Sequence, residues 1–260
     1  MIAALLAVAG LVALAHTAPF PFVLELFHRS RSMWRVPSEP DVPPTVYLTF
    51  DDGPNPEWTP AILDVLRDHR ARATFFLIDR HITPQTAAIV RRISDDGHGI
   101  GLHSGDRWLM LQAADAMAQT LENAAGHISD ITSREPCRMF RPHGGWRSVA
   151  MYAGLRKAGY LLVGWSWGMW DWNWWRGPDV HPLVARLASR ASAGSILVIH
   201  DGHHINPRAE RRHSVEVVTQ LIPRLQDRGF SFGVLCDMPR AVIMDRGQRT
   251  EERGPVNDKV

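Results

Sequence analysis

Short apolar runs alternate with amphipathic stretches along most of the chain. The apolar runs are rich in β-branched and aromatic residues, which predicts strands, and the stretches between them carry apolar residues at helical spacing. The predicted strands span residues 45–50, 73–78, 99–103, 138–141, 160–165, 195–200 and 230–235. Seven strand–helix units without a break in composition predict one α/β domain with a parallel sheet, either open or closed into a barrel.

Proline and glycine mark the predicted helix ends. Thr59 and Thr83 each precede a proline. This arrangement predicts an N-cap followed by a proline at the first helical position. Four glycines lie between an amphipathic stretch and the next strand, namely Gly97, Gly159, Gly194 and Gly229. We expect each of them to adopt the left-handed conformation that ends helices.

The two ends of the chain differ in composition from this body. Residues 1–24 contain no charged side chain, so segment 1–26 is predicted to be membrane-directed, as a cleaved signal peptide or a retained anchor. The arginines that follow it favour an anchor that leaves the next domain cytoplasmic, although the orientation stays open. Residues 27–44 are predicted to be a linker, 45–240 the folded domain, and 241–260 a frayed polar tail.

Overall composition excludes some classes of protein. A net charge of +2 with 45% hydrophobic residues argues against a disordered protein and against a nucleic-acid binder with a strong basic field. Only Cys137 and Cys236 are cysteines, so a disulfide framework and a cysteine-based zinc site are excluded, and two buried thiols are the favoured interpretation. The chain is, however, rich in histidine, with 13, and in tryptophan, with ten.

Polar residues that carry chemistry gather where the predicted strands end. They are Asp51, Asp52, His103, Arg141, Asp171 and His200. In parallel α/β folds the carboxyl ends of the strands form the active face. This coincidence favours an enzyme, although each residue alone has a structural interpretation, such as an Asx turn for the aspartates or an ion pair for the arginine.

The residue types suggest how such a site would work. Of two adjacent carboxylates at a strand end, one can bind a cation while the other faces the substrate as a base. Asp52 together with His103 would suit a zinc-like ion with an open position for water. Arg141 can hold an aspartate in one orientation. His200 suits a proton donor. By contrast, three further histidines in the loop after His200, namely His203, His204 and His213, are predicted to be solvated.

Six tryptophans fall between residues 165 and 175. They could form core and lid, or a flat wall that packs against the apolar face of a sugar ring. The second interpretation is favoured for some of them, and it predicts substrate contacts for Trp165, Trp170 and Trp172, with Trp146 from the loop after Arg141.

Taken together and in order, the motifs resemble those of the NodB-like polysaccharide deacetylases, carbohydrate esterase family 4. The resemblance covers roughly residues 46–235, through Thr49–Pro54, His103-Ser104, Arg141-Pro142, Asp171-Trp172 and 197–200. It implies a deformed (β/α) barrel. It also implies that Asp51 is the catalytic base, Asp52 and His103 are metal ligands, Arg141 orients the base, and Asp171 supports His200 as the acid.

The chain departs from the family pattern at the metal. Arg107 stands where the family has its second ligand histidine, and a guanidinium has no lone pair to give a metal. Gly168 replaces a frequently acidic residue, and His143 and Gly144 replace the usual residues after Arg141-Pro142. Three accounts are open: Asp106 or another histidine, such as His143, completes the site; two protein ligands hold the metal weakly; or no metal binds.

The resemblance implies a metal-dependent hydrolase, with zinc the favoured metal, that removes acetyl groups from a glycan. An alternative is a membrane-attached glycan-binding pseudoenzyme, for which Arg107 is the main argument. A third option, suggested by the charges after the apolar segment, is a deacetylase of a small cytoplasmic or lipid-linked sugar. The sequence does not specify the sugar, the acetylated atom or the oligomeric state.

Overall fold

The fold is that of a computed structural model, which describes residues 1–15, 32–38, 42–168 and 179–238. Its centre is a nine-stranded sheet with the order β1-β6-β5-β4-β3-β2-β8-β7, and β9 pairs with β2. The strands are β1 Ser32–Met33, β2 Thr45–Asp51, β3 Thr74–Leu77, β4 Gly99–His103, β5 Met139–Arg141, β6 Leu161–Val163, β7 Trp167–Gly168, β8 Ile196–His200 and β9 Ser231–Phe232. All of these pairs are parallel.

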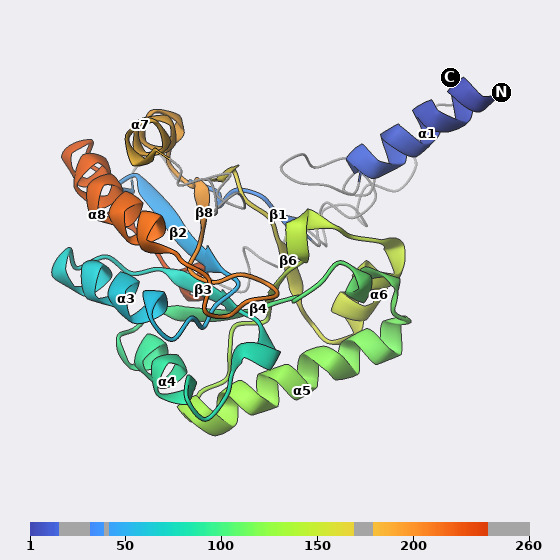
Figure 1. The fold of residues 1–260 in the computed structure, drawn as a ribbon, viewed down its shortest axis with the longest axis horizontal. Helices are drawn as coiled ribbons and strands as arrows, with labels where there is room; N and C mark the ends of the chain where they lie inside the picture. The colour runs from blue at the N-terminus through green and yellow to red at the C-terminus, as the bar shows by residue number, and fades with distance from the viewer. Residues whose placement is uncertain (16–31, 39–41, 169–178, 239–260) are drawn as a thin grey trace, which may run out of the picture.

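Helices cover the outside of the curled sheet (Figure 1). They are α3 Trp58–Asp68, α4 Ala87–Asp95, α5 Ala114–Thr132, α6 Val149–Lys157, α7 Val180–Arg190 and α8 Arg212–Asp227. The helix α1 Ile2–Ala15 does not cover the sheet (Figure 1). Neighbouring helices follow the order α6, α5, α4, α3, α8 and α7, which repeats the order of the strands beneath them. The architecture confirms the predicted α/β class and is the deformed (β/α) barrel that the resemblance implied.

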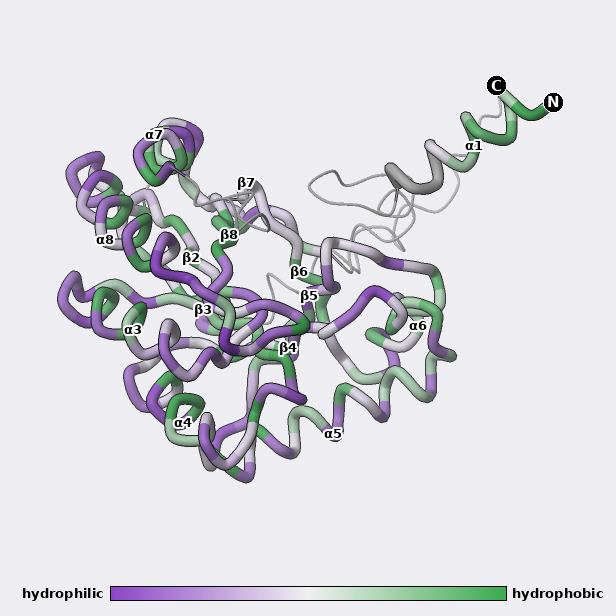
Figure 2. Tube along the Cα trace, viewed as in Figure 1, coloured by the Kyte–Doolittle hydropathy of each residue, from purple (hydrophilic) through white to green (hydrophobic). Residues whose placement is uncertain are grey.

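The core explains which strand positions face the site. Val46, Leu48 and Phe50 of β2 belong to the main apolar core beneath the helices. Because side chains alternate along a strand, Thr49 and Asp51 point to the inner side of the curl. Along α3, α5 and α8, hydrophobic and hydrophilic positions alternate as expected for helices with one buried side (Figure 2).

All seven predicted strands are present, but two short ones were not predicted. Ser32–Met33 lies in the predicted linker and pairs with β6, and Val36 after it is buried. Trp167–Gly168 pairs with β8. These two-residue strands lie outside the predicted apolar runs and are too short to produce an alternating pattern of their own, which is why the sequence does not reveal them. Residues 32–36 therefore pack as part of the folded domain rather than as a linker.

Three of the four predicted helix stops were correct, and the starts were not. Gly97, Gly159 and Gly229 follow the ends of α4, α6 and α8 and have φ angles between 70° and 81°. Gly194 also has a positive φ angle, but α7 already ends at Arg190, where Ala191 is extended. Thr59, however, lies inside α3, which begins at Trp58, and α4 begins only at Ala87, after a turn that starts at Thr83. The predicted N-caps are wrong at Thr59 because its hydroxyl serves a buried contact, and at Thr83 because a hydrogen-bonded turn precedes the helix.

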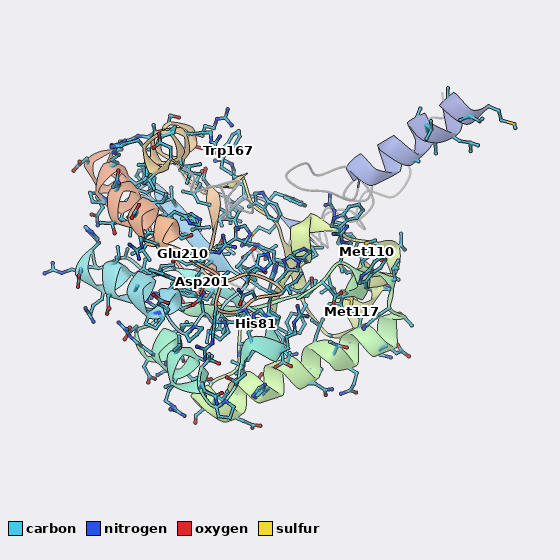
Figure 3. All side chains as sticks on the ribbon, in the orientation of Figure 1. His81, Met110, Met117, Trp167, Asp201 and Glu210 are labelled. Carbon is cyan, nitrogen blue, oxygen red and sulfur yellow. A yellow bond between two sulfur atoms is a disulfide. The ribbon has the colours of Figure 1, made fainter. Side chains whose placement is uncertain are left out.

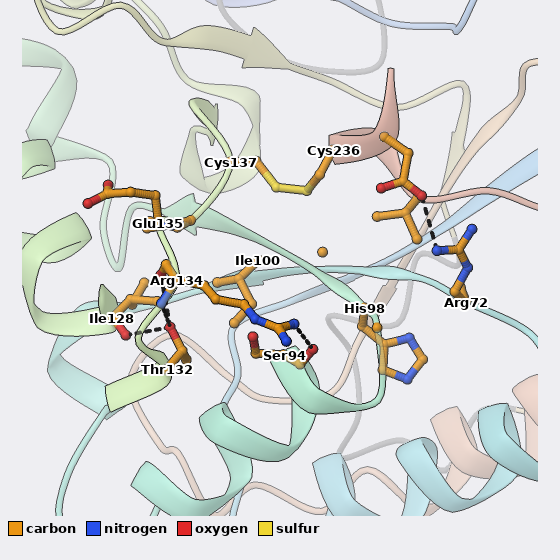
Figure 4. A pocket seen from close by; sticks show the side chains of 15 residues that line it. Arg72, Ser94, His98, Ile100, Ile128, Thr132, Arg134, Glu135, Cys137 and Cys236 are labelled. Atoms are coloured by element: carbon orange, nitrogen blue, oxygen red, sulfur yellow. Dashed lines mark hydrogen bonds and ion pairs between the residues drawn. A yellow bond between two sulfur atoms is a disulfide. The ribbon is translucent and has the colours of Figure 1, made fainter. Parts of the chain in front are cut away.

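The two cysteines form a disulfide, which corrects the expectation of buried thiols. Cys137 precedes β5, and Cys236 belongs to the 3₁₀ helix Leu235–Asp237 after β9. The bond lies beside a cavity of about 280 Å³ at the amino end of β4, which His98 also lines (Figure 4). The sequence did not predict the bond because 99 residues separate partners that only the fold brings together.

The described helices include none that is both long enough and apolar enough to cross a membrane, and the apolar helix α1 has 14 residues. The segment 241–260, predicted to be a tail, lies outside the described residues.

Candidate active site

The predicted residues lie together at the carboxyl ends of strands β8, β2, β4 and β5. In the sheet register Asp51 of β2 is paired with His200 of β8, and His103 of β4 is paired with Arg141 of β5. Strand β3 lies between these two pairs. The prediction that these residues share one edge of a parallel sheet is therefore confirmed. Asp171 lies outside the described residues, so its role stays a prediction.

Asp51 and Arg141 form a buried ion pair. One guanidinium nitrogen of Arg141 lies 2.6 Å from Oδ1 of Asp51 and 2.8 Å from the hydroxyl of Thr49. The other donors of the guanidinium reach the carbonyl oxygens of Val163, at 3.3 Å, and Gly164, at 3.0 Å. Burial lowers the pKa of Arg141, and the charge of Asp51 opposes this, so the guanidinium stays positive. The pair holds one oxygen of Asp51 in a fixed position.

His103 presents a lone pair to the carboxylate of Asp52. Its Nδ1 lies 2.8 Å from the carbonyl oxygen of Arg141, which can only accept, so Nδ1 carries the proton. In the neutral ring Nε2 then has a free lone pair, and it lies 3.3 Å from Oδ1 of Asp52. That oxygen is buried and has no hydrogen-bond partner apart from a protonated His103 ring. Two lone pairs at this separation need a cation, either a proton on Nε2 or a metal ion.

Charge around Asp52 favours its ionised form. Burial raises the pKa of Asp52, but a hydrogen bond to protonated His103 and the charges of His103, His200 and His143 lower it more, so the net shift is downward. Asp52 is a carboxylate at neutral pH. It is therefore ready to bind a positive ion.

His143 completes a group of three metal-type donors. One ligand atom each from Asp52, His103 and His143 lie within 4.8 Å of one another. His143 begins the 3₁₀ helix His143–Gly145 after β5, and its backbone N–H donates to the hydroxyl of Ser104 at 2.7 Å. Burial, with the nearby charge of His103, lowers the pKa of His143 to about 3. The ring is thus neutral and able to donate a lone pair, and these three residues fit a divalent metal with one oxygen and two nitrogen ligands.

Arg107 and Asp106 lie outside this group. The carboxylate of Asp106 accepts hydrogen bonds from the backbone N–H groups of Trp108, at 2.8 Å, and Leu109, at 3.2 Å. It caps the 3₁₀ helix Trp108–Leu111 and is exposed, as is Arg107. Of the three accounts of the missing ligand, the geometry favours His143 over Asp106.

His81 and Asp201, both labelled in Figure 3, hold the turn that carries Asp52. Nδ1 of His81 lies 3.0 Å from the carbonyl oxygen of Asp52. The buried carboxyl of Asp201 accepts a hydrogen bond from the hydroxyl of Thr59 and packs so closely against Gly53 that a side chain there would overlap it. Asp52 itself has φ 74°, an unusual backbone conformation for a residue with a side chain.

Asp201 is a site residue that the sequence analysis missed. Burial raises its pKa to about 7, the hydrogen bond from Thr59 lowers it, and the charges of Asp52 and Asp51 raise it further. Its backbone N–H donates to the carbonyl oxygen of Asp51 at 3.2 Å. The only sequence signal is its place directly after His200. We expect Asp201 to hold the strand-end loops together.

The loop histidines correct the expectation that they are solvated. The ring of His204 lies 4.3 Å from that of His143, and the ring of His203 lies 4.5 Å from that of His204, between centroids. Burial lowers the pKa of His203 to about 4 and also lowers that of His204. His213 is in helix α8 and is 8% exposed. The fold turns this loop back over the site, which local composition does not indicate.

Of the four tryptophans predicted to contact a sugar, the structure describes two, Trp165 and Trp146. Trp165 is half-buried, 6.3 Å from Trp34 between ring centroids, and its ring lies 5.9 Å from the guanidinium carbon of Arg141. Trp146 is half-buried beside the turn that carries His143. Trp170 and Trp172 lie outside the described residues. The predicted contacts of these four tryptophans with a sugar stay predictions.

Comparison with known proteins identifies relatives of the whole domain. A family model described as polysaccharide deacetylase matches residues 38–163. A peptidoglycan-N-acetylglucosamine deacetylase of Bacillus cereus is 31% identical over 210 residues, which cover 80% of this chain and 92% of that protein. A chitooligosaccharide deacetylase of Azorhizobium caulinodans is 34% identical over 195 residues, covering 72% and 90%.

A solved structure has the same fold. The crystal structure of a peptidoglycan N-acetylglucosamine deacetylase superimposes with a TM-score of 0.71 at 25% identity, and the match covers 86% of this chain and 97% of the other. The structural match therefore covers most of this chain and nearly all of the other.

Proposed function

Because the chain belongs to the polysaccharide deacetylase family, we propose that it is a metal-dependent hydrolase that removes N-acetyl groups from a glycan. The observation that carries the proposal is that an oriented carboxylate and a group of three potential metal ligands lie at the same edge of the sheet. The Asp51–Arg141 ion pair supplies an oriented carboxylate, and Asp52, His103 and His143 supply three converging lone pairs. A protein that only binds a glycan needs neither.

The donor set supports a divalent metal, for which we propose zinc. Zinc accepts imidazole nitrogen and carboxylate oxygen, and a site with three protein ligands leaves a position for water. When bound, the metal would polarise the acetyl carbonyl and lower the pKa of water. His143 would take the place of the family's second histidine. This removes the main argument for the pseudoenzyme alternative, which was Arg107.

Asp51 is proposed as the general base. Arg141 holds one of its oxygens, at 2.6 Å, and leaves the other for the attacking water. As the water oxygen forms its bond to the acetyl carbon, Asp51 takes a proton from it. Arg141 is itself held by backbone carbonyls and by the ring of Phe76, 4.1 Å away, so the base stays in one orientation.

His200 is proposed as the proton donor to the leaving nitrogen. It ends β8 in register with Asp51, and the hydroxyl of Ser214 donates to its carbonyl oxygen at 2.7 Å. Breakage of the carbon–nitrogen bond releases an amine, which takes the proton from His200, and acetate. One water is consumed for each acetyl group removed. Support of His200 by Asp171 remains part of the proposal.

We propose further that the domain works in an oxidising compartment outside the cytoplasm. The Cys137–Cys236 disulfide supports this, because such bonds persist where thiols are not kept reduced. The apolar segment at the start of the chain would direct it there as a cleaved signal peptide. A retained anchor would do so only in the orientation opposite to the one that its following arginines favour. Thiol labelling of protein from the native host tests the proposal: blocked cysteines are expected, and two free thiols would contradict it.

Acetate release tests the proposed reaction. Purified protein loaded with zinc is expected to release acetate from N-acetylated chitooligosaccharides, to lose the activity on dialysis against a chelator, and to regain it with zinc. Asp51→Asn should bind the same amount of zinc and release acetate far more slowly. Absence of acetate release from every N-acetylated glycan, with zinc bound, would contradict the proposed function.

A further inference from the structure

Arg107 is an exposed cation in the loop that follows His103. Among the described residues no side chain forms a hydrogen bond or ion pair with its guanidinium. Its neighbours are already engaged: Arg80 donates to the carbonyl oxygens of Gly105 and His204, and the carboxylate of Asp106 caps the backbone of the next turn. Because Asp106 is directed to these backbone groups, Arg107 keeps its full charge available to a ligand.

The loop that carries Arg107 lies against the site. Arg80 joins the carbonyl oxygens of Gly105, two residues before Arg107, and of His204, so the two loops lie side by side. The ring of His204 packs against that of His143 at 4.3 Å. His103 is the last residue of β4, and Arg107 follows it by four residues. A group bound to Arg107 therefore lies beside the proposed reaction centre rather than on a remote surface.

Exposed apolar side chains surround the same edge. Between residues 45 and 238, the large hydrophobic side chains that the structure describes as exposed are Trp108 at 67%, Leu111 at 64%, Val149 at 60% and Ile205 at 73%. All four lie in segments that follow the carboxyl ends of β4, β5 and β8. Exposed apolar side chains on segments that follow the active edge of the sheet are typical of a binding surface. Trp108 is the residue directly after Arg107 in the chain, and its ring is exposed.

We propose that Arg107 and Trp108 form a subsite for an acidic sugar, one that carries a carboxylate and lies next to the N-acetyl sugar undergoing hydrolysis. This inference rests on the proposed function, because it names the substrate of the same site. The planar guanidinium forms two parallel hydrogen bonds with a carboxylate, and the indole packs on the apolar face of the sugar ring. One unpaired guanidinium matches the single charge of a carboxylate better than the nearly double charge of a phosphate.

The arrangement also explains what the chain gains at position 107. A histidine at this position would belong to the metal site, as the family pattern implies. With His143 available as the third donor, position 107 is released to bind substrate. The change of residue type thus alters which glycan is preferred without removing a metal ligand.

Calorimetric binding of two matched probes to the zinc-loaded protein tests the inference. The first is an oligosaccharide of alternating N-acetylglucosamine and N-acetylmuramic acid with free lactyl carboxylates, and the second is the same oligosaccharide with those carboxylates amidated. The wild type is expected to bind the acidic probe about fivefold more tightly than the amidated one, as one exposed charge pair supplies. The preference should shrink at high salt.

Three variants separate the contributions. Arg107→Gln keeps most of the side-chain length without its charge, and should bind both probes equally. Trp108→Ala should weaken both probes alike, by about fivefold, and keep their ratio, since stacking does not depend on the carboxylate. Arg224→Gln, which removes an exposed charge from α8, should retain the wild-type preference.

Equal affinity of the wild type for the two probes, or an unchanged preference in Arg107→Gln, would overturn the inference. Acetate release by the wild type from neutral chitooligosaccharides reports separately on the proposed function. The binding ratio needs no turnover, so the two failures are distinguishable.

Discussion

His98 and His103 lie at the two ends of the same strand and have opposite hydrogen-bonding states. Nδ1 of His103 donates to a carbonyl, which leaves the lone pair of Nε2 facing Asp52. Nδ1 of His98 instead accepts from the backbone N–H of Ala73, at 3.2 Å, so Nε2 carries the proton of the neutral ring. His98 also packs edge-on against Phe75. One histidine is arranged to bind a cation and the other to fill the interior.

The two edges of the sheet differ in the same way. At the carboxyl edge, the side chains of Asp51, Asp52 and Arg141 are buried, and burial of charged groups is unfavourable unless they are paired or bind ions. At the amino edge, the Cys137–Cys236 disulfide joins the segments before β5 and after β9, beside a cavity whose charged lining residues are exposed rather than buried (Figure 4). Substitutions at the carboxyl edge should therefore change chemistry, and those at the amino edge should change stability.

The largest expected effect is on turnover at the carboxyl edge. Asp51→Asn should lower the rate of acetate release by about 10²–10⁴-fold, because an amide cannot accept the proton of water. Asp96→Asn, which removes a surface partner of Arg92 next to the amino edge, serves as the matched control and should keep the wild-type rate. Steady-state kinetics on a chitooligosaccharide measures both. Equal rates for Asp51→Asn and wild type would exclude Asp51 as the base.

At the amino edge, loss of the disulfide should lower stability and leave the chemistry intact. Replacing Cys137 and Cys236 together by serine is expected to reduce the free energy of unfolding by about 2–4 kcal/mol, since the bond restricts the unfolded chain. Denaturant unfolding measures this, and the rate constant for acetate release from folded protein should not change. A variant that unfolds like the wild type but has lost activity would reverse the assignment of the two edges.

A smaller effect is expected of His98 on the pH dependence of the free energy of unfolding. Burial lowers the pKa of His98 to about 4 from its ordinary value of 6.5. Between these values the unfolded chain binds a proton that the native protein does not, so stability falls as the pH drops from 6.5 towards 4. The loss amounts to about 3 kcal/mol at most. His98→Gln should remove this component.

Unfolding of wild type and His98→Gln across pH 4–7 provides the measurement. His143 and His203 have lowered pKa values as well, but they contribute equally to both proteins. The difference between the two curves therefore reports His98. Parallel curves over the whole range would show that His98 is not held neutral.

Much of this arrangement could be predicted from sequence because it follows from local pattern. Strand ends at Asp51, His103, Arg141 and His200 are visible as polar residues after apolar runs, and parallel strands bring their ends to one edge. The ordered motifs then indicated the family. The left-handed glycines were equally local, since a helix followed by a strand requires a sharp change of direction.

What sequence could not predict depends on contacts between distant segments. The convergence of His143 with Asp52 requires the turn after β5 to fold over the sheet edge. Asp201 and Thr59 meet across 142 residues, and the disulfide partners across 99. The hydroxyl of Thr59 was interpreted as a helix cap because a local role is all that a local pattern can show.

Calorimetric titration of the metal-free protein with zinc tests the central claim most directly, namely that His143 replaces the family's second ligand histidine. We expect the wild type and His98→Gln to bind one zinc ion per chain with equal affinity. His143→Ala should bind zinc at least about 100-fold more weakly, beyond the loss typical of residues that only support a ligand. Equal zinc affinity in His143→Ala and wild type would contradict the account.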